Sequence, residues 1–194
     1  MGGNMKPLLE FQMNASFNVL KSTIDGVTDH EWTSRPYPKA NVVGFTLWHC
    51  LRTIDWAINC VGAGADEMAE QPQWRDVKPD ATFFGAGLSA DKADWVAHTI
   101  GRRRAGEYLD ALRAESLGWL RALPPNDLNR VVDLKALRGG KPEHLEPAVW
   151  AEIADLNGIP LWQFLARPCV MHIRVHYGEV TAQLEALRAA ATPS

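Results

Sequence analysis

Apolar residues recur at steps of three and four in the first part of the chain, and this period constrains the fold more than any other feature. Between residues 7 and 25 they occupy Leu9, Met13, Phe17, Leu20 and Ile24. That spacing places them on one face of an α-helix, and an apolar face of this kind must be buried against other elements. We therefore expect an amphipathic helix here that packs against further helices.

Three more stretches have the length and pattern of helices, namely residues 42–60, 90–123 and 160–190. Asn41 is a candidate cap for the first of them and Ser89 for the second, because both residue types accept hydrogen bonds from free backbone N–H groups. Gly101 marks a potential break in the second. Pro168 falls inside the third, where the missing N–H predicts a kink or a restart.

The connections between these helices are long and irregular. Residues 62–88 are rich in glycine and proline, residues 129–137 predict a short extended piece, and residues 148–156 predict a short helix. A βαβ alternation would need regular strands between the helices. We therefore predict an all-α chain forming one domain over residues 1–194, a four-helix bundle with long irregular crossover connections.

Composition argues against several classes of protein. The 194 residues carry a formal net charge of −3, without the basic excess that is typical of nucleic-acid binders. No apolar run approaches the roughly 18 residues that span a bilayer, so we expect no membrane partner and a cytoplasmic location. The three cysteines are widely spaced and odd in number, so no disulfide framework is predicted.

The stretch PCVMHIRVHYGEV, residues 168–180, places His172 and His176 four positions apart on the last predicted helix. Residues at this spacing share a face, so the two imidazoles can bind one metal ion. Two hydrogen-bonded histidines without a metal would give the same pattern. A zinc peptidase is excluded, because the glutamate that follows the first histidine in HExxH is Ile173 here.

A third histidine, His49, lies on a largely apolar face of the helix predicted for residues 42–60. A single histidine in such a place is usually a buried residue with an ordinary hydrogen bond. Three histidines on the inward faces of two helices could instead form a three-nitrogen site. Such a site keeps one coordination position open for water or substrate, as catalytic zinc sites do.

SRPYP at residues 34–38, NVVGFTLWHCLRTIDW at residues 41–56 and the late HIRVHYGEV at residues 172–180 together resemble the DinB-like superfamily. The resemblance implies a small four-helix protein that often forms a homodimer. It also implies a divalent metal ion, zinc or nickel, bound by His49, His172 and His176. Availability often decides between these two metals, because both suit imidazole ligands.

Two residues near the histidine pair leave alternatives open. Glu179 follows Gly178 where the family commonly has glutamine. Its carboxylate could orient a ligand from the second coordination sphere or act as a base. Cys169, three residues before His172, is an alternative donor, although buried free cysteines are often simply small apolar residues.

Four further residues are candidates for the wall of a substrate pocket, namely Trp48, Arg52, Trp56 and Tyr177. Arg52 has a second interpretation, an ion pair with Asp55, and we prefer it. The segment GAGLSA, residues 85–90, fits a dinucleotide-binding pattern but lacks the preceding strand, so we interpret it as a turn.

The resemblance leaves the activity open between classes. Some relatives are S-transferases or isomerases that use a low-molecular-weight thiol and a small-molecule substrate, and this is the first function hypothesis. A hydrolase that uses metal-bound water is the enzymatic alternative. A stress-induced helical protein without catalysis is the alternative from another class.

Overall fold

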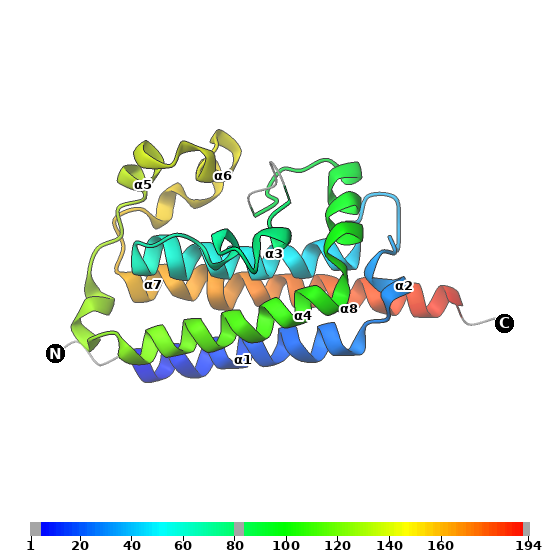
Figure 1. Ribbon diagram of the computed structural model, residues 1–194, viewed down its shortest axis with the longest axis horizontal. Coiled ribbons are helices and arrows are strands. Elements are labelled where there is room, and N and C mark those ends of the chain that lie inside the picture. The colour runs from blue at the N-terminus through cyan, green and yellow to red at the C-terminus, as the bar shows by residue number, and fades with distance from the viewer. Residues whose placement is uncertain (1–4, 80–83, 192–194) are drawn as a thin grey trace.

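The computed structural model describes residues 5–79 and 84–191, and within them the secondary structure is helical. The long helices are α1 (Lys6–Gly26), α3 (Val43–Asp55), α4 (Ala90–Ala122) and α8 (His172–Ala191). The β-structure in the described part of the chain consists of one isolated β-bridge, between Val131 and Pro160. The predicted all-α class is confirmed (Figure 1).

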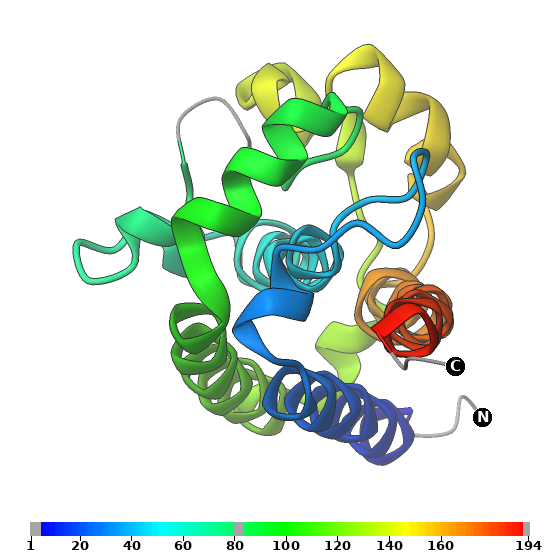
Figure 2. The ribbon, with the colours of Figure 1, turned by 90° about the vertical axis from the view of Figure 1, so that its right-hand side faces the viewer.

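The four long helices surround one core. Helix α1 packs against α4 and α8, and α3 packs against the same two helices from the other side. Figure 2 shows this arrangement end on, with α1 and α3 on opposite corners. All five apolar residues predicted for the inner face of the first helix are buried. The period of the sequence therefore predicted correctly which side of α1 faces the core.

Two of the long helices continue into wide π-helical turns. Helix α3 passes into η1 (Trp56–Ala63), and α7 (Leu161–Ala166) passes through η7 (Arg167–Met171) into α8. Pro168 lies in η7, so the break predicted there takes the form of a π turn rather than an interruption. A π turn accommodates the missing N–H because its hydrogen bonds run over one more residue than those of an α-helix.

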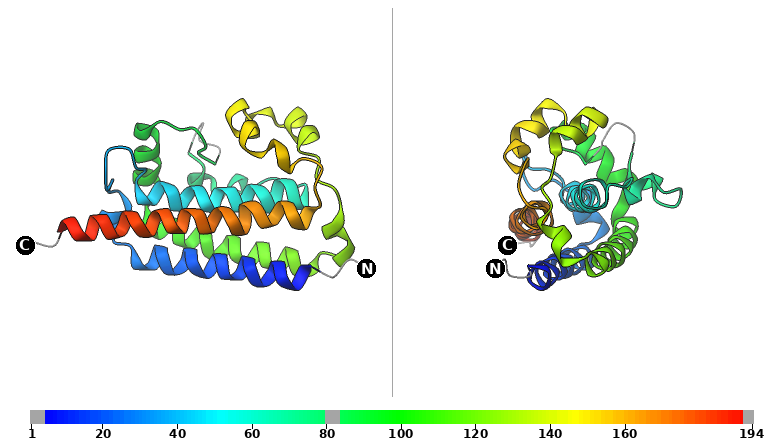
Figure 3. Two further views of the ribbon diagram at one scale, coloured as in Figure 1. Left: turned by 180° about the vertical axis from the view of Figure 1, so that it is seen from behind. Right: turned by 90° about the vertical axis from the view of Figure 1, so that its left-hand side faces the viewer.

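The connecting segments hold short helices. Helix α2 (Asp29–Trp32) follows α1 and begins with a capping box made by Thr28 and Glu31. Helices α5 (Leu134–Gly140) and α6 (Pro147–Ile153) lie between α4 and α7 and cover one end of α3 and α7 (Figure 3). Short 3₁₀ turns complete the connections, at Met68–Glu70, Arg75–Val77, Pro125–Asn129, Pro142–His144 and Ala154–Leu156.

Several local predictions can be compared with these elements. Ser89 caps α4 by accepting a hydrogen bond from the backbone N–H of Lys92. Gly101 has φ 63° and ψ 154°, which bends α4 as expected and suits a residue without a Cβ. The predicted cap at Asn41 is wrong, because Val42 precedes α3 and no side chain caps it.

The predicted extended piece at residues 129–137 is wrong over its second half. Helix α5 begins at Leu134, and the Asp133 side chain accepts a hydrogen bond from the N–H of Ala136. This cap satisfies one of the free N–H groups of the first turn and favours helix over strand. The predicted helix at residues 148–156 agrees with α6 and the 3₁₀ turn that follows it.

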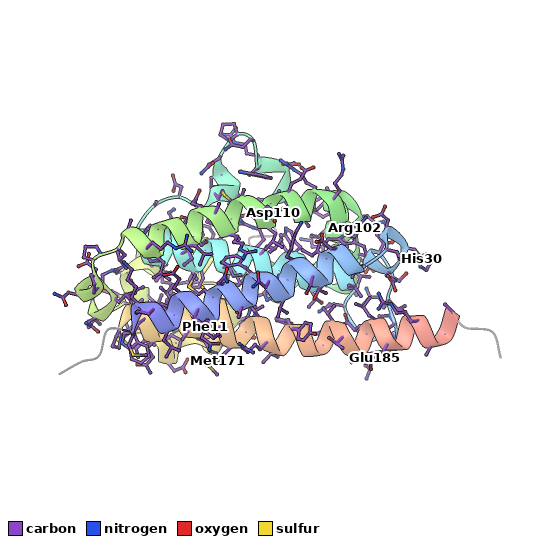
Figure 4. All side chains as sticks on the ribbon, turned by 90° about the horizontal axis from the view of Figure 1, so that it is seen from below. Phe11, His30, Arg102, Asp110, Met171 and Glu185 are labelled. Atoms are coloured by element: carbon purple, nitrogen blue, oxygen red, sulfur yellow. The ribbon has the colours of Figure 1, made fainter. Side chains whose placement is uncertain are left out.

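Exposed ion pairs join the helices at the surface, two of them through Asp110 and Arg102 of α4, which Figure 4 labels. Lys21 of α1 contacts Asp110 of α4 at 3.2 Å, and Arg102 of α4 contacts Asp29 of α2 at 2.9 Å. On the other side of α1, Phe11 and Met171 are exposed apolar residues. Over the described ranges, every helix is too short or too polar to cross a membrane.

Candidate metal centre

His49 from α3 and His172 and His176 from α8 meet at one point beside the core. The Nε2 atom of His172 lies 3.1 Å from the Nε2 atom of His49 and 3.1 Å from that of His176. In the described part of the chain, these three side chains form the one group of histidine, cysteine or acidic residues whose ligand atoms lie close enough together to hold a metal ion. Antiparallel packing of α3 against α8 brings together residues that are 123 positions apart.

The other ring nitrogens of two of these histidines have acceptors. His49 Nδ1 contacts the backbone carbonyl of Phe84, and His176 Nδ1 lies 2.8 Å from Oε2 of Glu179. An oxygen acceptor at Nδ1 places the proton on that nitrogen and leaves a lone pair on Nε2. Both imidazoles are therefore held in the tautomer that presents Nε2 as a ligand.

Hydrogen bonds among the three histidines do not satisfy the cluster. His172 Nε2 can donate one proton at most, so it can serve only one of the two facing lone pairs. The Nδ1 atom of His172 is buried and has no hydrogen-bond partner within the described ranges. One cation at the shared point would satisfy all three Nε2 atoms together.

The nitrogen spacing fits a metal ion. Two ligand nitrogens that each lie about 2.0–2.1 Å from a tetrahedral zinc ion are about 3.3 Å apart. The measured 3.1 Å distances from His172 to its two neighbours are close to this value. The donor set of three imidazoles suits zinc and nickel equally well.

Burial keeps the imidazoles in the form that binds metal. Loss of solvent, together with the neighbouring His176, lowers the pKa of His49 to about 4. The same loss of solvent, with the nearby His49, His176 and Arg167, lowers the pKa of His172 to about 2. Both rings are therefore neutral near pH 7, and a neutral imidazole is the metal-binding form.

A cavity of about 350 Å³ opens beside the three histidines. Its walls come from α3, the start of η1, the segment after residue 83, helix α6, and the junction of α7 with η7. Most of the lining is apolar, and Glu152 and Arg167 are its acidic and basic residues apart from the three histidines. The apolar lining consists of Phe45, Trp56, Phe84, Ala86, Val149, Ile153, Leu156, Phe164 and Pro168, with Gly85 and Gly87.

Of the four predicted pocket residues, the structure places one at this cavity. Trp56 lines it. Trp48 is fully buried in the core instead, with its indole N–H donated to the Val77 carbonyl at 2.7 Å. Tyr177 is partly exposed and lines a groove between α1 and α8. Trp48 and Tyr177 share the helices of the histidines but point to other neighbours.

Arg52, the fourth predicted pocket residue, is also placed away from the cavity. It is fully buried and donates to Asp55 at 2.8 Å and to Glu67 at 2.9 Å. The alternative interpretation of Arg52, an ion pair with Asp55, is therefore the one that the geometry bears out. A guanidinium engaged by two buried carboxylates is not available to a substrate anion.

The two residues next to the histidine pair occupy different environments. Glu179 is half-buried, contacts His176, and also accepts a hydrogen bond from Gln183 at 3.1 Å. The bond from His176 lowers the pKa of Glu179, so its carboxylate is ionised. Cys169 is buried away from the three nitrogens, and burial raises the pKa of its thiol. Glu179 can orient a ligand, whereas Cys169 lies outside the donor group.

Sequence reasoning missed Phe84 and Arg167. The Phe84 carbonyl fixes the tautomer of His49, but a backbone acceptor in an irregular segment leaves no signal in the sequence. Arg167 lies one residue before Pro168 and five before His172, so its place on the histidine helix could have drawn attention to it. Only the bundle shows that its side chain lines the cavity.

Comparison with known proteins gives the family of the chain. A family model described as the DinB superfamily matches residues 12–153, which is most of the chain. The match includes His49 and ends before His172 and His176, so it does not extend to the histidine pair. A search of curated proteins finds no match. The extent of the family match shows that this chain belongs to the DinB superfamily.

Proposed function

We propose that the protein is an enzyme that depends on a divalent metal ion, with His49, His172 and His176 as the metal ligands. The observation that supports this proposal most directly is that three Nε2 atoms converge at the wall of a mostly apolar cavity. Three protein ligands leave a coordination position for a small molecule, as in catalytic rather than structural zinc sites. The reaction that we propose is transfer or isomerisation with a low-molecular-weight thiol.

The chain's own residues have defined roles in this proposal. Three neutral imidazoles leave the full charge of the ion uncompensated, and the Phe84 carbonyl and Glu179 orient two of the rings. A divalent ion with this charge, when bound, lowers the pKa of a thiol or a water molecule toward neutrality. The mostly apolar walls suit an organic acceptor, which supports transfer over hydrolysis.

Glu179 is better suited to orienting His176 than to moving a substrate proton. Both of its oxygens are engaged, one by His176 and the other by Gln183. A carboxylate that holds the outer nitrogen of a ligating histidine is a common arrangement around metal ions. We therefore propose a positioning role for Glu179 in place of the alternative role as a base.

Metal analysis tests the first half of the proposal. The untagged protein is exchanged into zinc or nickel, freed of excess metal, and measured by elemental analysis beside the His49→Ala, His172→Ala and His176→Ala variants. We expect one ion per chain in the natural protein and almost none in the variants. The His30→Ala variant, which changes an exposed histidine on α2, is the matched control.

An activity screen tests the second half. The metal-loaded protein is assayed with several biological thiols against electrophilic acceptors, and in parallel with esters and amides without thiol. Thiol-dependent turnover that disappears in His172→Ala would support the proposal. Turnover of esters or amides without thiol would favour the hydrolase, and a fully loaded protein without turnover would favour a non-catalytic protein.

A further inference from the structure

The cavity beside the histidines is a mostly apolar space with aromatic walls. Phe45 and Trp56 from α3 and η1, Phe84 from the crossover segment and Phe164 from α7 contribute the rings. Val149 and Ile153 of α6 close the opposite side. Rings and branched side chains on facing walls favour a ligand with a flat or branched apolar body.

Arg167 is a charged residue of this lining that lacks a carboxylate partner in the described part of the chain. It is exposed at the cavity, and no carboxylate of the described residues lies within ion-pair distance of it. Trp56 is 3% exposed and contributes its ring to the wall, whereas its indole nitrogen is enclosed by the protein. A guanidinium without a carboxylate partner at the wall of a mostly apolar cavity is available to an anionic ligand.

Both of these residues stand where a π turn begins. Trp56 opens η1 and Arg167 opens η7, and the two turns reach the cavity from different helices. Single π turns inside helices occur frequently at functional sites, because the wider turn shifts side chains out of the regular register. The two π turns thus bring Trp56 and Arg167 to the wall of the same cavity.

The charge of the lining limits the ligand further. Arg167 contributes one positive charge, and Glu152 contributes one negative charge elsewhere in the lining. A phosphate group usually recruits several cations or a series of backbone N–H groups. One guanidinium in an otherwise apolar cavity suits a monoanion, and a carboxylate fits a guanidinium with two parallel hydrogen bonds.

We infer that the cavity binds a carboxylic acid with an aromatic or branched apolar body, whose carboxylate pairs with Arg167. The inference rests on the proposed function in one respect, because this acid would be the organic substrate that reacts beside the metal. Binding itself requires only the cavity and Arg167.

A matched set of probes tests the inference: 3-phenylpropanoate, 3-phenylpropanol and 3-phenylpropylamine, which share one body and differ in charge. Their affinities are measured by calorimetry with protein stripped of metal and with protein loaded with zinc. We expect the acid to bind at least about tenfold more tightly than the alcohol in both forms, and the amine to bind most weakly. The measurement with metal-free protein shows whether the acid is preferred when its carboxylate cannot bind to a metal ion.

Two variants assign the preference to residues. Arg167→Gln should lower the affinity for the acid to that for the alcohol and leave the affinity for the alcohol unchanged. Arg103→Gln, which changes an exposed arginine of α4, should alter neither affinity. Trp56→Phe keeps an aromatic wall and should leave the preference for the acid over the alcohol unchanged. Circular dichroism checks that each variant is folded.

Three outcomes would overturn the inference. They are equal binding of acid and alcohol by the natural protein, a preference that survives Arg167→Gln and requires zinc, and no binding of any probe. Failure of the proposed function is separable from these. If the protein took up no metal and still preferred the acid through Arg167, the metal-dependent activity would fail and the binding site would stand.

Discussion

Helix α3 carries two polar clusters within about one turn, one half-buried and one fully buried, and they differ in how their hydrogen bonds are satisfied. His49 faces α8 and meets two other histidines beside a cavity. Arg52 and Asp55 face α4 and the segment after η1, where they meet Glu67 and Tyr108. The first cluster leaves nitrogen atoms without partners in the described part of the chain, and the second is held together mainly by the chain itself.

The arginine cluster is a structural clamp. Asp55 accepts hydrogen bonds from the backbone N–H of Met68 at 2.8 Å and of Ala69 at 3.1 Å, which fixes the crossover segment against α3. The Tyr108 hydroxyl donates to the same carboxylate from α4. Arg52 balances the buried negative charge, and burial raises the pKa of Glu67. A buried charge with this many partners ties three segments together.

The histidine cluster lacks such closure. Its Nδ1 atoms on His49 and His176 are oriented by the protein, whereas three Nε2 atoms face one another and His172 Nδ1 has no partner in the described ranges. The difference teaches that burial of polar residues does not by itself mark a functional site. A set of donor atoms left without partners beside a cavity is a better indication of such a site.

The largest expected effect of a single change lies in the arginine cluster. Asp55→Ala should lower the free energy of unfolding by about 3–5 kcal/mol, because it removes one of the two carboxylates that pair with Arg52 and leaves the buried donors of Met68, Ala69 and Tyr108 without their acceptor. Chemical denaturation of protein without metal measures this loss. A loss below about 1 kcal/mol would contradict the clamp. Asp25→Ala, which changes an exposed aspartate of α1, is the matched control.

Removal of a histidine should affect metal binding strongly and stability without metal only weakly, in contrast to Asp55→Ala. His172→Ala should weaken metal binding by at least about 100-fold, which corresponds to roughly 2.7 kcal/mol. Its free energy of unfolding without metal should change much less than that of Asp55→Ala. Zinc should raise the melting temperature of the natural protein and leave that of the variant unchanged. Equal stabilisation of both proteins by zinc would show that the ion binds elsewhere.

A smaller effect is expected from Glu179, which acts through His176. Glu179→Ala should weaken zinc binding by about 10–100-fold, as is usual when the partner of a ligating histidine is lost. Glu179→Gln should weaken it less, because the amide oxygen still accepts from His176 Nδ1. Competition with a chromogenic chelator measures both. Identical affinities of the two variants and the natural protein would remove Glu179 from the site.

The smallest effect is expected from an exposed ion pair. Lys21→Ala breaks the contact with Asp110 at 3.2 Å, and both side chains are well exposed to solvent. We expect a loss of about 0.2–1 kcal/mol in the free energy of unfolding, because solvent screens such pairs. Denaturation beside Asp55→Ala measures the contrast. A loss as large as that of Asp55→Ala would mean that burial does not separate the two kinds of pair.

Part of the fold and of the site could be predicted from local patterns. The buried face of α1, the cap at Ser89, the bend at Gly101 and the shared face of His172 and His176 depend on neighbours within a few residues. Interactions over one or two helical turns are set by the backbone geometry, so their spacing in the sequence is sufficient. Asn41 and Asp133 show the limit, since Asn41 has a capping residue type and caps no helix, whereas Asp133 caps α5 in a stretch whose pattern predicted an extended piece.

Placement of side chains around α3 could not be predicted in the same way. Trp48, His49, Arg52 and Trp56 are all polar or aromatic residues of one helix, and each meets a different neighbour. A helical period gives the angle between residues, whereas the identity of the facing helix depends on the whole bundle. For this reason Trp48 and Arg52 looked like pocket residues and are core residues.

The sequence by itself determined the helices, the two histidines one turn apart and the presence of a third on another helix. The tertiary structure decided that His49 reaches the pair, that the Phe84 carbonyl and Glu179 orient the rings, and that Arg167 and Trp56 share a cavity with them. The physical reason is range. Helix formation depends on contacts within a turn or two, whereas the site consists of contacts between segments that only packing of the core brings together.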